Sequence, residues 1–563
     1  MSTDDDSDEP VALETIAAAV EAGVTIFDTA RAYTGGVDEL GHNERLLARA
    51  LRACDGHRRA RIVSKGGMGR PDGAWIPDGR AKTILSDCEA SLAALGGLPI
   101  DLYLIHAPDP RTPWRTSVRA LARLVAERLV ARVGLANVNR HQLDEALDLA
   151  PITAVQVALS PYDDSAVRGG LVAHCAEMGI AVIAHSPLGG PRRARGLARH
   201  PPLAEVAGAR GVSPAEVALA WLLTLSPSVV AIPGARRPQT ARSAAHAASV
   251  VLDARDRALL AGAFASPRQH LREPARLRDD ADVVLVMGIP GAGKSRVAEE
   301  HVARGYLRLN RDERGGSLRK LAGALESELA SGVRHVVLDN TWLTRAARSD
   351  VVDSATRHRI PTRCVWIDIP LAQAQVNVVH RILERFGALP APDELRALSR
   401  RVPGIVMPTA QMRALRELEH PHADERFAAV EHMPFHRDRA PASARRGVFV
   451  AASALRQPGW AGALDGVDRT APHLVFDWRP DGSTGALRAG VARVLAEVSG
   501  PVEGALCPHP AGPPMCWCRP PLPGLPLAFA RAHDIDPALS TVVGTGAAHR
   551  TLAVTLGARF VHV

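Results

Sequence analysis

A glycine-rich segment at residues 288–295 has the composition and spacing of a loop that binds nucleotide phosphates. Gly288, Gly291 and Gly293 lead into Lys294 and Ser295, in the pattern GxxxxGKS. In such a loop the backbone N–H groups surround the phosphates, the lysine reaches the β and γ oxygens, and the serine hydroxyl binds Mg²⁺. An apolar run precedes the segment and a helical pattern follows it, as this chemistry requires. The sequence therefore predicts a site for ATP with Mg²⁺, in which Ser295 is a metal ligand.

Two later segments carry charged residues that suit the same phosphate chemistry. Asp339 ends the apolar run 335–339, where a second carboxylate can approach the magnesium ion, directly or through water. In the helical pattern 375–387, Arg381 and Arg385 are four residues apart and share a face. Arginines at such a place can stabilise charge on a transferring phosphate, although a solvated amphipathic helix accounts for the pattern equally well.

A second set that could do chemistry lies near the N-terminus and consists of Asp28, Tyr33, Lys65 and His106. Each ends or closely follows a short apolar run, and parallel strands bring such ends to one edge. An ammonium group makes a neighbouring phenol a stronger acid, a carboxylate holds the ammonium in place, and a histidine can orient a carbonyl. The chain has four lysines in all. Since arginine cannot replace lysine where a compact, tunable ammonium is needed, Lys65 and Lys294 are candidates for function.

A third set is a cluster of metal-binding side chains near the C-terminus. Cys507, His509, Cys516 and Cys518 stand in short loops rich in proline and glycine. Four such ligands suit a tetrahedral Zn²⁺. Clustered cysteines in a chain of this length indicate a metal site in a reducing compartment rather than a disulfide framework, so we expect structural zinc and a cytoplasmic location.

The pattern around the second set predicts a barrel. Between residues 14 and 265 short apolar runs alternate with amphipathic helical patterns, which is typical of βαβ units and a parallel sheet. This length indicates a (β/α)8 TIM barrel whose first strand is missing from the sequence, so that the barrel is open at one seam or its true start lies upstream. Seven strands are predicted, at residues 25–28, 61–64, 101–105, 132–135, 154–157, 181–184 and 229–232.

Two charged segments divide the remainder of the 563 residues, which are too many for one core. The predicted organisation is a barrel at 1–268, a linker at 269–281, an αβα P-loop domain at 282–437, a linker at 438–446 and a small Rossmann-like α/β domain at 447–563. The net charge of +8 is modest and favours no particular partner. No targeting or membrane segment is predicted.

The order of Asp28, Tyr33, Lys65 and His106 resembles the aldo-keto reductase family over residues 11–265. The resemblance implies NADPH-dependent reduction of a carbonyl compound, with Tyr33 as the proton donor and no metal. Members of that family begin with a strand ahead of the first helix, which this sequence lacks. The resemblance also implies nicotinamide contacts from Asn137 and Gln156, and cofactor phosphate contacts from Ser186, Arg236 and Arg237.

The Asn-Arg-Asp triplet at residues 310–312 resembles the polynucleotide kinase family. There the aspartate accepts the proton of an attacking 5′-hydroxyl, which implies that Asp312 is the general base and that Arg311 and Arg314 contact the acceptor phosphate. Kinases of small molecules share most of these parts, so the acceptor stays open. Trp342 is a candidate for stacking on a base.

The spacing of the zinc ligands, with Arg519 following, resembles phosphatases of the haloacid dehalogenase superfamily of the histidinol-phosphate type. In that superfamily two aspartates follow the first strand, and here Ala451 and Ser453 occupy the places. The final motif has Thr545 instead of aspartate, and no lysine follows residue 320. Without an aspartate nucleophile no aspartyl-phosphate can form. The sequence therefore predicts a zinc-binding domain that has lost phosphatase chemistry.

These features lead to three hypotheses. In the first, a kinase acting on a 5′-hydroxyl end of a nucleic acid is fused to an NADPH-dependent reductase of an unidentified carbonyl substrate. In the second, a small-molecule kinase and a carbonyl reductase act on the same metabolite. In the third, the barrel and the C-terminal domain are binding scaffolds around one active kinase.

Overall fold

The computed structural model describes residues 9–34, 39–264, 276, 280–435 and 445–563. The chain forms two compact units, residues 1–272 together with residues 345–349, and the rest of the chain from Glu273 onward. The predicted linkers at 269–281 and 438–446 lie almost entirely outside the described residues, and the four boundaries between the five predicted segments stay predictions.

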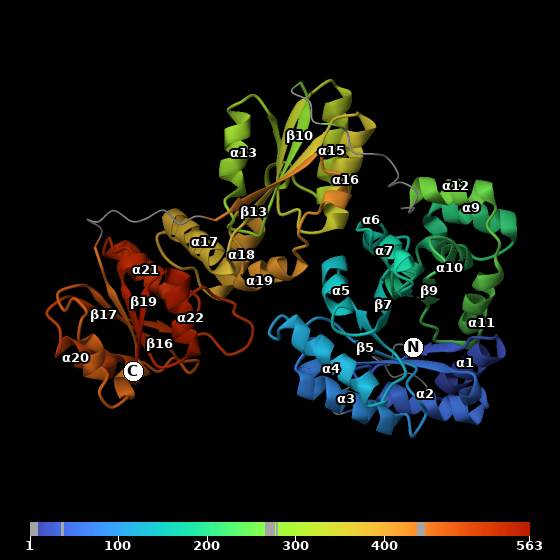
Figure 1. The fold of residues 1–563 in the computed structure, drawn as a ribbon, viewed down its shortest axis with the longest axis horizontal. Coiled ribbons are helices and arrows are strands. Elements are labelled where there is room, and N and C mark those ends of the chain that lie inside the picture. Colours follow the sequence, from blue (N-terminus) through green and yellow to red (C-terminus); the bar gives the residue numbers. More distant parts are fainter. Residues whose placement is uncertain (1–8, 35–38, 265–275, 277–279, 436–444) are drawn as a thin grey trace. The chain divides into compact units, whose positions relative to one another are not determined.

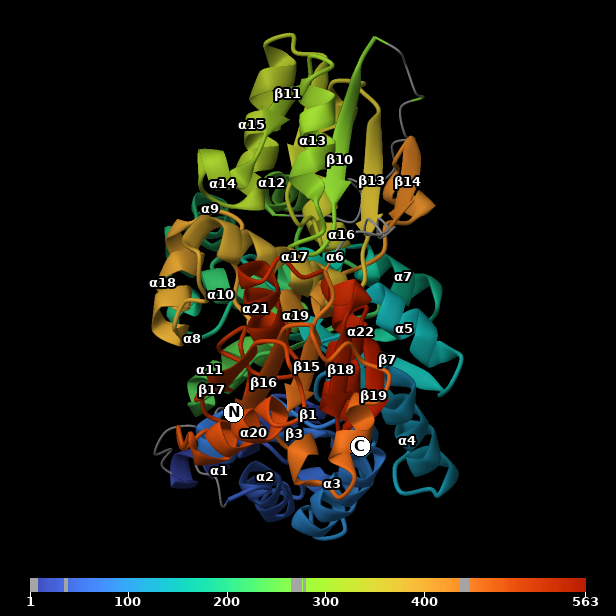
Figure 2. The ribbon, with the colours of Figure 1, turned by 90° about the vertical axis from the view of Figure 1, so that its left-hand side faces the viewer.

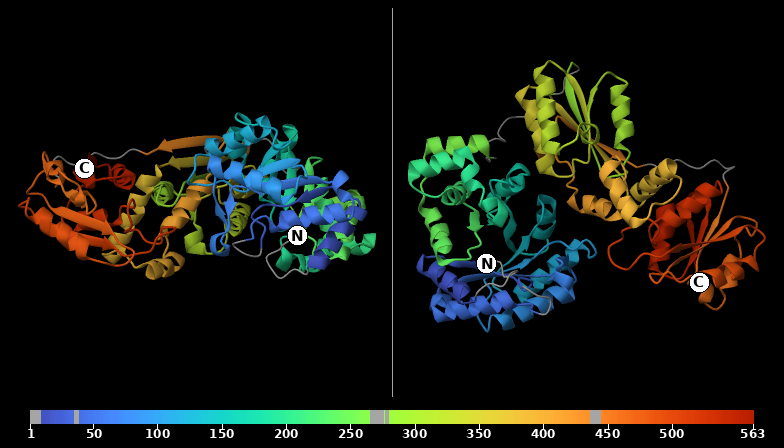
Figure 3. Two further views of the ribbon diagram at one scale, coloured as in Figure 1. Left: turned by 90° about the horizontal axis from the view of Figure 1, so that it is seen from below. Right: turned by 180° about the vertical axis from the view of Figure 1, so that it is seen from behind.

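The first unit is built on a parallel sheet that curves into a nearly closed barrel (Figures 1 and 3). Among the described residues its strands follow the order β1-β2-β5-β6-β7-β8-β9, and every neighbouring pair is parallel. All seven predicted strands are present, with small differences at their ends. They are β1 (Ile26–Asp28), β2 (Arg61–Gly66), β5 (Leu102–Ile105), β6 (Val133–Ala136), β7 (Ile152–Ala158), β8 (Ala181–His185) and β9 (Val229–Ile232).

Helices surround this sheet, as the alternating pattern predicts. A short hairpin between β2 and the next helix was not predicted; its strands are β3 (Met68–Gly69) and β4 (Ile76–Pro77). The helices are α1 (Glu9–Glu21), α2 (His42–Ala53), α3 (Ala81–Ala94), α4 (Trp114–Ala126), α5 (Arg140–Leu147), α6 (Ser165–Arg168), α7 (Leu171–Glu177), α8 (Pro191–Ala194), α9 (Pro201–Arg210), α10 (Pro214–Thr224), α11 (Pro238–His246) and α12 (Ala254–Ala263).

Two helices bridge the ends of the barrel sheet. Strands β1 and β9 stand at opposite ends of the strand order and do not pair with each other within the described ranges. Helix α1 precedes β1, helix α11 follows β9, and the two helices pack side by side. Arg242 of α11 donates to Glu21 of α1, with 3.1 Å between Nη2 and Oε2. Helical cover of this kind shields a sheet edge that would otherwise be exposed.

The second unit begins with a five-stranded parallel sheet in the order β11-β12-β10-β13-β14. Figure 2 shows β10, β13 and β14 side by side. The strands are β10 (Asp282–Met287), β11 (Leu307–Leu309), β12 (His335–Asp339), β13 (Thr362–Asp368) and β14 (Ala429–Pro434). The helices are α13 (Lys294–Val302), α14 (Arg311–Arg314), α15 (Leu318–Ala330), α16 (Arg345–Arg357), α17 (Leu371–Phe386), α18 (Pro392–Arg401) and α19 (Pro408–Glu417). Residues 345–349 of α16 are grouped with the first unit.

A second five-stranded parallel sheet, in the order β17-β16-β15-β18-β19, completes this unit. Alternate residues of the central strand point to opposite faces, so that Phe449 lies in one core and Val448 in another. Helices α21 and α22 cover the first face and α20 the second (Figure 1). The elements are β15 (Val448–Ala451), β16 (His473–Trp478), α20 (Gly485–Leu495), β17 (Val502–Cys507), α21 (Gly524–Ala532), β18 (Thr541–Gly544), α22 (Ala547–Leu556) and β19 (Arg559–His562).

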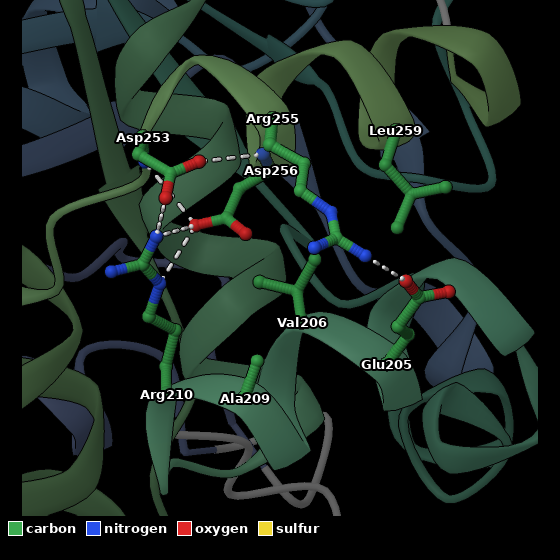
Figure 4. A pocket seen from close by; sticks show the side chains of 8 residues that line it. All are labelled: Glu205, Val206, Ala209, Arg210, Asp253, Arg255, Asp256 and Leu259. Carbon is green, nitrogen blue, oxygen red and sulfur yellow. Dashed lines mark hydrogen bonds and ion pairs between the residues drawn. The ribbon is translucent and has the colours of Figure 1, made fainter.

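A hollow of about 300 Å³ on the barrel lies between α9 and α12 (Figure 4). Arg210 of α9 bonds Asp256 of α12 through Nε and Nη2, at 2.8 and 2.6 Å from Oδ2, and also pairs with Asp253. The charged side chains in the hollow therefore pair with one another and link the two helices.

Among the described residues, no helix is both long and apolar enough to cross a membrane.

Candidate functional sites

The centre of the barrel site is the buried ammonium group of Lys65, on β2. Its side chain is 0% exposed, and Nζ lies 2.7 Å from both carboxylate oxygens of Asp28, at the end of β1. Nζ also donates to the backbone oxygen of Thr29, at 2.9 Å. Burial by itself lowers the pKa of Lys65, but the charges of Asp28 and Tyr33 outweigh burial, so that pKa stands above its ordinary value. The predicted lysine–carboxylate pair is thus present and keeps the ammonium charged.

Three aromatic rings cluster at the mouth of the barrel, and one of them, Tyr33, lies against the ammonium group. Lys65 Nζ lies 4.8 Å from the centroid of the Tyr33 ring. The His106 ring meets Tyr33 edge to face, with 5.5 Å between centroids, and Trp75 lies 5.5 Å from His106 and 6.2 Å from Tyr33. Burial, with the nearby Lys65 charge, lowers the pKa of His106 to about 3, so the imidazole is neutral at pH 7. The four predicted catalytic residues therefore converge on one place.

The amides predicted to contact a nicotinamide lie on the same edge of the sheet. Gln156 Nε2 donates to Asp28 Oδ1 at 2.7 Å, and Asn137 Nδ2 donates to the backbone oxygen of His106 at 2.9 Å. His185, at the end of β8, bonds Asn137 Oδ1 through Nε2 at 3.0 Å. These bonds tie the ends of β1, β5, β6, β7 and β8 into one network of polar side chains.

The predicted phosphate-contacting residues follow the last two strands. Ser186 directly follows β8 and has a left-handed backbone, φ 51°. Arg236 and Arg237 are exposed in the segment between β9 and α11. The three residues thus come from the same end of the sheet as Asp28, Tyr33, Lys65 and His106.

A carboxylate on α3 fixes the two loops that carry the catalytic groups. Arg31, two residues before Tyr33, bonds Asp87 through Nε at 2.9 Å from Oδ1. The other Asp87 oxygen accepts from the backbone N–H of Gly67 at 2.9 Å. Gly66, next to Lys65, has to be glycine because a Cβ there would lie 2.0 Å from the Tyr103 hydroxyl oxygen.

In the second unit, the segment predicted to bind phosphates forms a loop between β10 and α13. Gly288, Gly291 and Gly293 have φ of 154°, 88° and 92°. Lys294 Nζ donates to the backbone oxygens of Gly288 and Ile289, at 2.9 and 3.0 Å, and Ser295 is exposed in the first turn of α13. Burial lowers the pKa of Lys294 to about 8, partly offset by Asp339.

Asp339, at the end of β12, is held by two residues of the neighbouring strand and its end. Arg308 bonds both carboxylate oxygens, with 3.0 Å from Nε to Oδ1 and 2.6 Å from Nη2 to Oδ2. Asn310 Nδ2 donates to Oδ1 at 2.8 Å. Asp339 and Asp312 both act electrostatically on Lys294, so the predicted carboxylates lie around the predicted lysine.

Helices α17 and α19 contact the phosphate loop directly. Asn377 Nδ2 donates to the backbone oxygen of Gly291, and Gln411 Nε2 to that of Pro290, both at 2.8 Å. Arg381 also acts on Lys294 electrostatically and donates to the backbone oxygen of Gly404 at 3.0 Å. Arg385, one turn further along α17, is exposed. Of the two predicted arginines, Arg381 is therefore the one that the structure brings to the phosphate loop.

The residues predicted to serve the acceptor differ in their surroundings. Asp312 is 41% exposed and pairs with Arg311 at 3.5 Å, while Arg314 pairs with Glu328 of α15 at 3.2 Å. The prediction that Trp342 stacks on a base is wrong for this conformation. Trp342 has a left-handed backbone, φ 43°, and its side chain packs in the core, where it is 0% exposed.

The four predicted zinc ligands converge. Their ligand atoms lie within 4.8 Å of one another. Cys507 Sγ is 3.8 Å from Cys516 Sγ and 3.4 Å from Cys518 Sγ, and His509 Nδ1 is 3.5 and 3.2 Å from Cys507 Sγ and Cys518 Sγ. A tetrahedral zinc with Zn–S of about 2.3 Å and Zn–N of about 2.0 Å implies about 3.8 Å between two sulfur atoms and about 3.5 Å between sulfur and nitrogen. The donor set and its spacing therefore fit zinc.

The positions that would carry phosphatase chemistry hold no carboxylate. Ser453 follows β15, and its Oγ bonds Thr545 Oγ1, beyond β18, at 3.2 Å. Asp477, near the end of β16, pairs with Arg479 at 3.3 Å. Two hydroxyl groups thus bond each other where the resemblance would place carboxylates.

Several site residues were missed from the sequence. Trp75 does not follow any predicted strand. No sequence motif or spacing singles out the other four, which are His185, Arg308, Asn377 and Gln411. The one usable signal was the position of His185 at the end of a predicted apolar run.

Comparison with known proteins gives two separate matches. A model described as "Aldo/keto reductase family" matches residues 1–263, and one described as "AAA domain" matches residues 283–400. The Glycine max protein named "Probable aldo-keto reductase 1" is 31% identical over 245 residues, 38% of this chain and 68% of that protein. Among solved structures, a thermostable aldo-keto reductase in complex with the inhibitor epalrestat is 32% identical, covering 46% of this chain and 89% of its own, with a TM-score of 0.40. An aldo/keto reductase from Klebsiella pneumoniae in complex with NADP and acetate is 25% identical, covering 47% and 89%, with a TM-score of 0.41.

Proposed function

Because the chain belongs to the aldo/keto reductase family, we propose that its barrel reduces a carbonyl compound to the alcohol with NADPH. The chain is an enzyme that combines an oxidoreductase domain with a kinase-like domain. The observation that carries the proposal is the buried Lys65–Asp28 pair beneath the Tyr33 ring.

The chemistry of the barrel follows from these three residues. NADPH, when bound, supplies a hydride to the carbonyl carbon. The Tyr33 hydroxyl gives its proton to the carbonyl oxygen, so that C–H and O–H bonds form as the C=O double bond becomes single. Lys65, kept charged by Asp28, stabilises the phenolate that remains. Neutral His106 orients the carbonyl.

Two groups of residues would hold the cofactor. Asn137 and Gln156 lie beside the ion pair, where they suit the nicotinamide carboxamide. Ser186, Arg236 and Arg237 suit its phosphates, and two arginines favour NADP(H) over NAD(H).

Absorbance of NADPH, followed with a series of aldehydes and ketones, tests this activity, with Tyr33→Phe as the inactive control. If a fluorescence titration detects no binding of NADPH, the barrel is a scaffold, as the third hypothesis holds.

We propose phosphoryl transfer from ATP as the activity of the second unit. The observation that favours it is the glycine-rich loop between β10 and α13, where Lys294 Nζ bonds the backbone oxygens of Gly288 and Ile289. Asp339, Arg381 and Asp312 all act electrostatically on this lysine. The acceptor hydroxyl oxygen forms a bond to the γ-phosphorus while the bond from γ-phosphorus to the bridging oxygen breaks, and ADP leaves. Asp312, exposed beside the loop, takes the hydroxyl proton. Mg²⁺ would be held by Ser295 and by Asp339 through water, since Arg308 and Asn310 already bond that carboxylate.

We propose a 5′-hydroxyl nucleic-acid end as the acceptor, on the strength of the Asn-Arg-Asp triplet at 310–312. ATP labelled in the γ-phosphate, incubated with a 5′-hydroxyl oligonucleotide, tests the choice. Label in the oligonucleotide supports it, and label only in added small metabolites excludes it and favours a small-molecule acceptor, as in the second hypothesis. We also propose that the C-terminal domain binds structural zinc and is inactive as a phosphatase; release of phosphate from a 3′-phosphate oligonucleotide would contradict this.

A further inference from the structure

Helix α17 is a shared wall of the phosphate loop and the C-terminal domain. On one side, Asn377 bonds the backbone oxygen of Gly291. The contact there is so close that a Cβ on Gly291 would lie 2.4 Å from the backbone oxygen of Ala374. Any displacement of α17 therefore moves the loop that holds the phosphates.

The other side of α17 is part of the core of the C-terminal domain. Val379, Ile382 and Leu383 are buried in one continuous hydrophobic cluster with residues of β15, β16, α21 and α22. Helix α17 packs against both α21 and α22. The helix that carries Arg381 thus has no separate core of its own on this side, since Phe449, Phe529 and Leu552 complete it.

The metal-binding loop, residues 507–519, reaches the same helices. Trp517 stands between two of the predicted ligands, Cys516 and Cys518, and is 2% exposed. Its indole Nε1 donates to the backbone oxygen of Val406, between α18 and α19, at 3.1 Å. Leu389, just beyond α17, packs against the three cysteines. The loop therefore contacts the chain on both sides of α18, just after α17 at Leu389 and just before α19 at Val406.

We propose that the metal-binding loop is a brace for the kinase site, so that zinc in the C-terminal domain holds α17 and α19 against the phosphate loop. The inference rests on the proposed zinc site. A metal bound by Cys516 and Cys518 fixes the backbone on both sides of Trp517. Without the metal the four ligands are no longer joined through one ion. The backbone that positions Trp517, and the cysteines against which Leu389 packs, are then less rigid. The C-terminal domain then contributes to phosphoryl transfer through position alone.

Hydrogen–deuterium exchange of the full chain tests the brace without any need for turnover. The zinc-loaded protein is compared with protein stripped by 1,10-phenanthroline, both without nucleotide. We expect exchange in peptides of 371–386 and 405–417 to become about tenfold faster after stripping, while peptides of β7 and β8 in the barrel stay unchanged. Faster exchange confined to 447–563, or a chain that takes up no zinc, overturns the proposal.

A pair of matched variants separates the brace from general loss of stability. Trp517→Phe keeps most of the ring but removes the donor to Val406, whereas Trp460→Phe makes the same change in the core on the opposite face of the sheet. We expect faster exchange of α17–α19 in W517F alone, with zinc content unchanged in both. Equal exchange of these helices in the two variants overturns the proposal.

The two proposals fail in different ways. If the chain phosphorylates no acceptor but the exchange of α17–α19 depends on zinc, the brace proposal stands and the kinase proposal fails. If phosphoryl transfer occurs, and both its rate and the exchange of α17–α19 are the same with and without zinc, the kinase proposal stands and the brace proposal fails.

Discussion

Replacing Asp28 by asparagine tests whether the buried Lys65 ammonium depends on its counter-ion. Lys65 is 0% exposed, and both oxygens of Asp28 lie 2.7 Å from Nζ, whereas Nζ also donates to the neutral carbonyl of Thr29 at 2.9 Å and lies 4.8 Å from the centroid of the Tyr33 ring. Asparagine keeps the shape and removes the charge. Leaving one charge of a buried pair without its partner costs about 3–5 kcal/mol, so we expect the free energy of unfolding of the barrel to fall by that amount at neutral pH.

The sign of the pH dependence follows from the direction of the Lys65 pKa. Because the folded-state pKa is raised above 10.5, the pair contributes in full below 10.5 and its contribution is lost as pH rises through the folded-state value. Asp28→Asn should therefore be most destabilising at neutral pH and less so in strong alkali.

Urea unfolding followed by pulse proteolysis provides the measurement, with fragments of residues 81–263 reporting on the barrel. The surface control is Glu127→Gln, which breaks an exposed pair with Arg123 and should cost about 0–1 kcal/mol. The double variant Asp28→Asn, Lys65→Met leaves no buried charge and should be more stable than Asp28→Asn alone. A cost of Asp28→Asn no greater than that of Glu127→Gln, or a double variant with simply additive losses, would refute the reasoning.

Four further predictions concern activity. Tyr33→Phe removes the proton donor and should lower kcat for aldehyde reduction about 10²–10⁴-fold, with NADPH affinity unchanged by fluorescence titration. Trp75→Ala opens the ring cluster and should raise KM about tenfold for aromatic aldehydes but not for small aliphatic ones. Since burial lowers the pKa of Lys294 to about 8, this lysine loses its proton as pH rises through that value, and ATP affinity measured without acceptor should fall there; constant affinity across that range argues against it. Asp312→Asn should lower phosphoryl transfer about 10²–10⁴-fold with ATP binding kept, and wild-type rates would exclude Asp312 as the base.

The sequence determined the elements and the choice of candidate reacting groups. Seven apolar runs predicted the seven barrel strands, because strand burial and alternation with helices are local properties of the chain. Asp28, Tyr33, Lys65 and His106 could be chosen because residues that end parallel strands must meet at one edge. The zinc ligands could be chosen because a short spacing leaves them few ways to lie apart.

Only the tertiary structure decided which charges meet and which helices share a core. Trp342 was a candidate for stacking on a base and is buried, since its exposure depends on packing by distant segments. Arg381 and Arg385 are equivalent in the sequence pattern, yet Arg381 acts on Lys294 and Arg385 is exposed. The bond from Trp517 to Val406 joins residues 111 positions apart. Contacts of this kind depend on how whole layers pack, and a local pattern of residue types holds no information about the surface that will cover it.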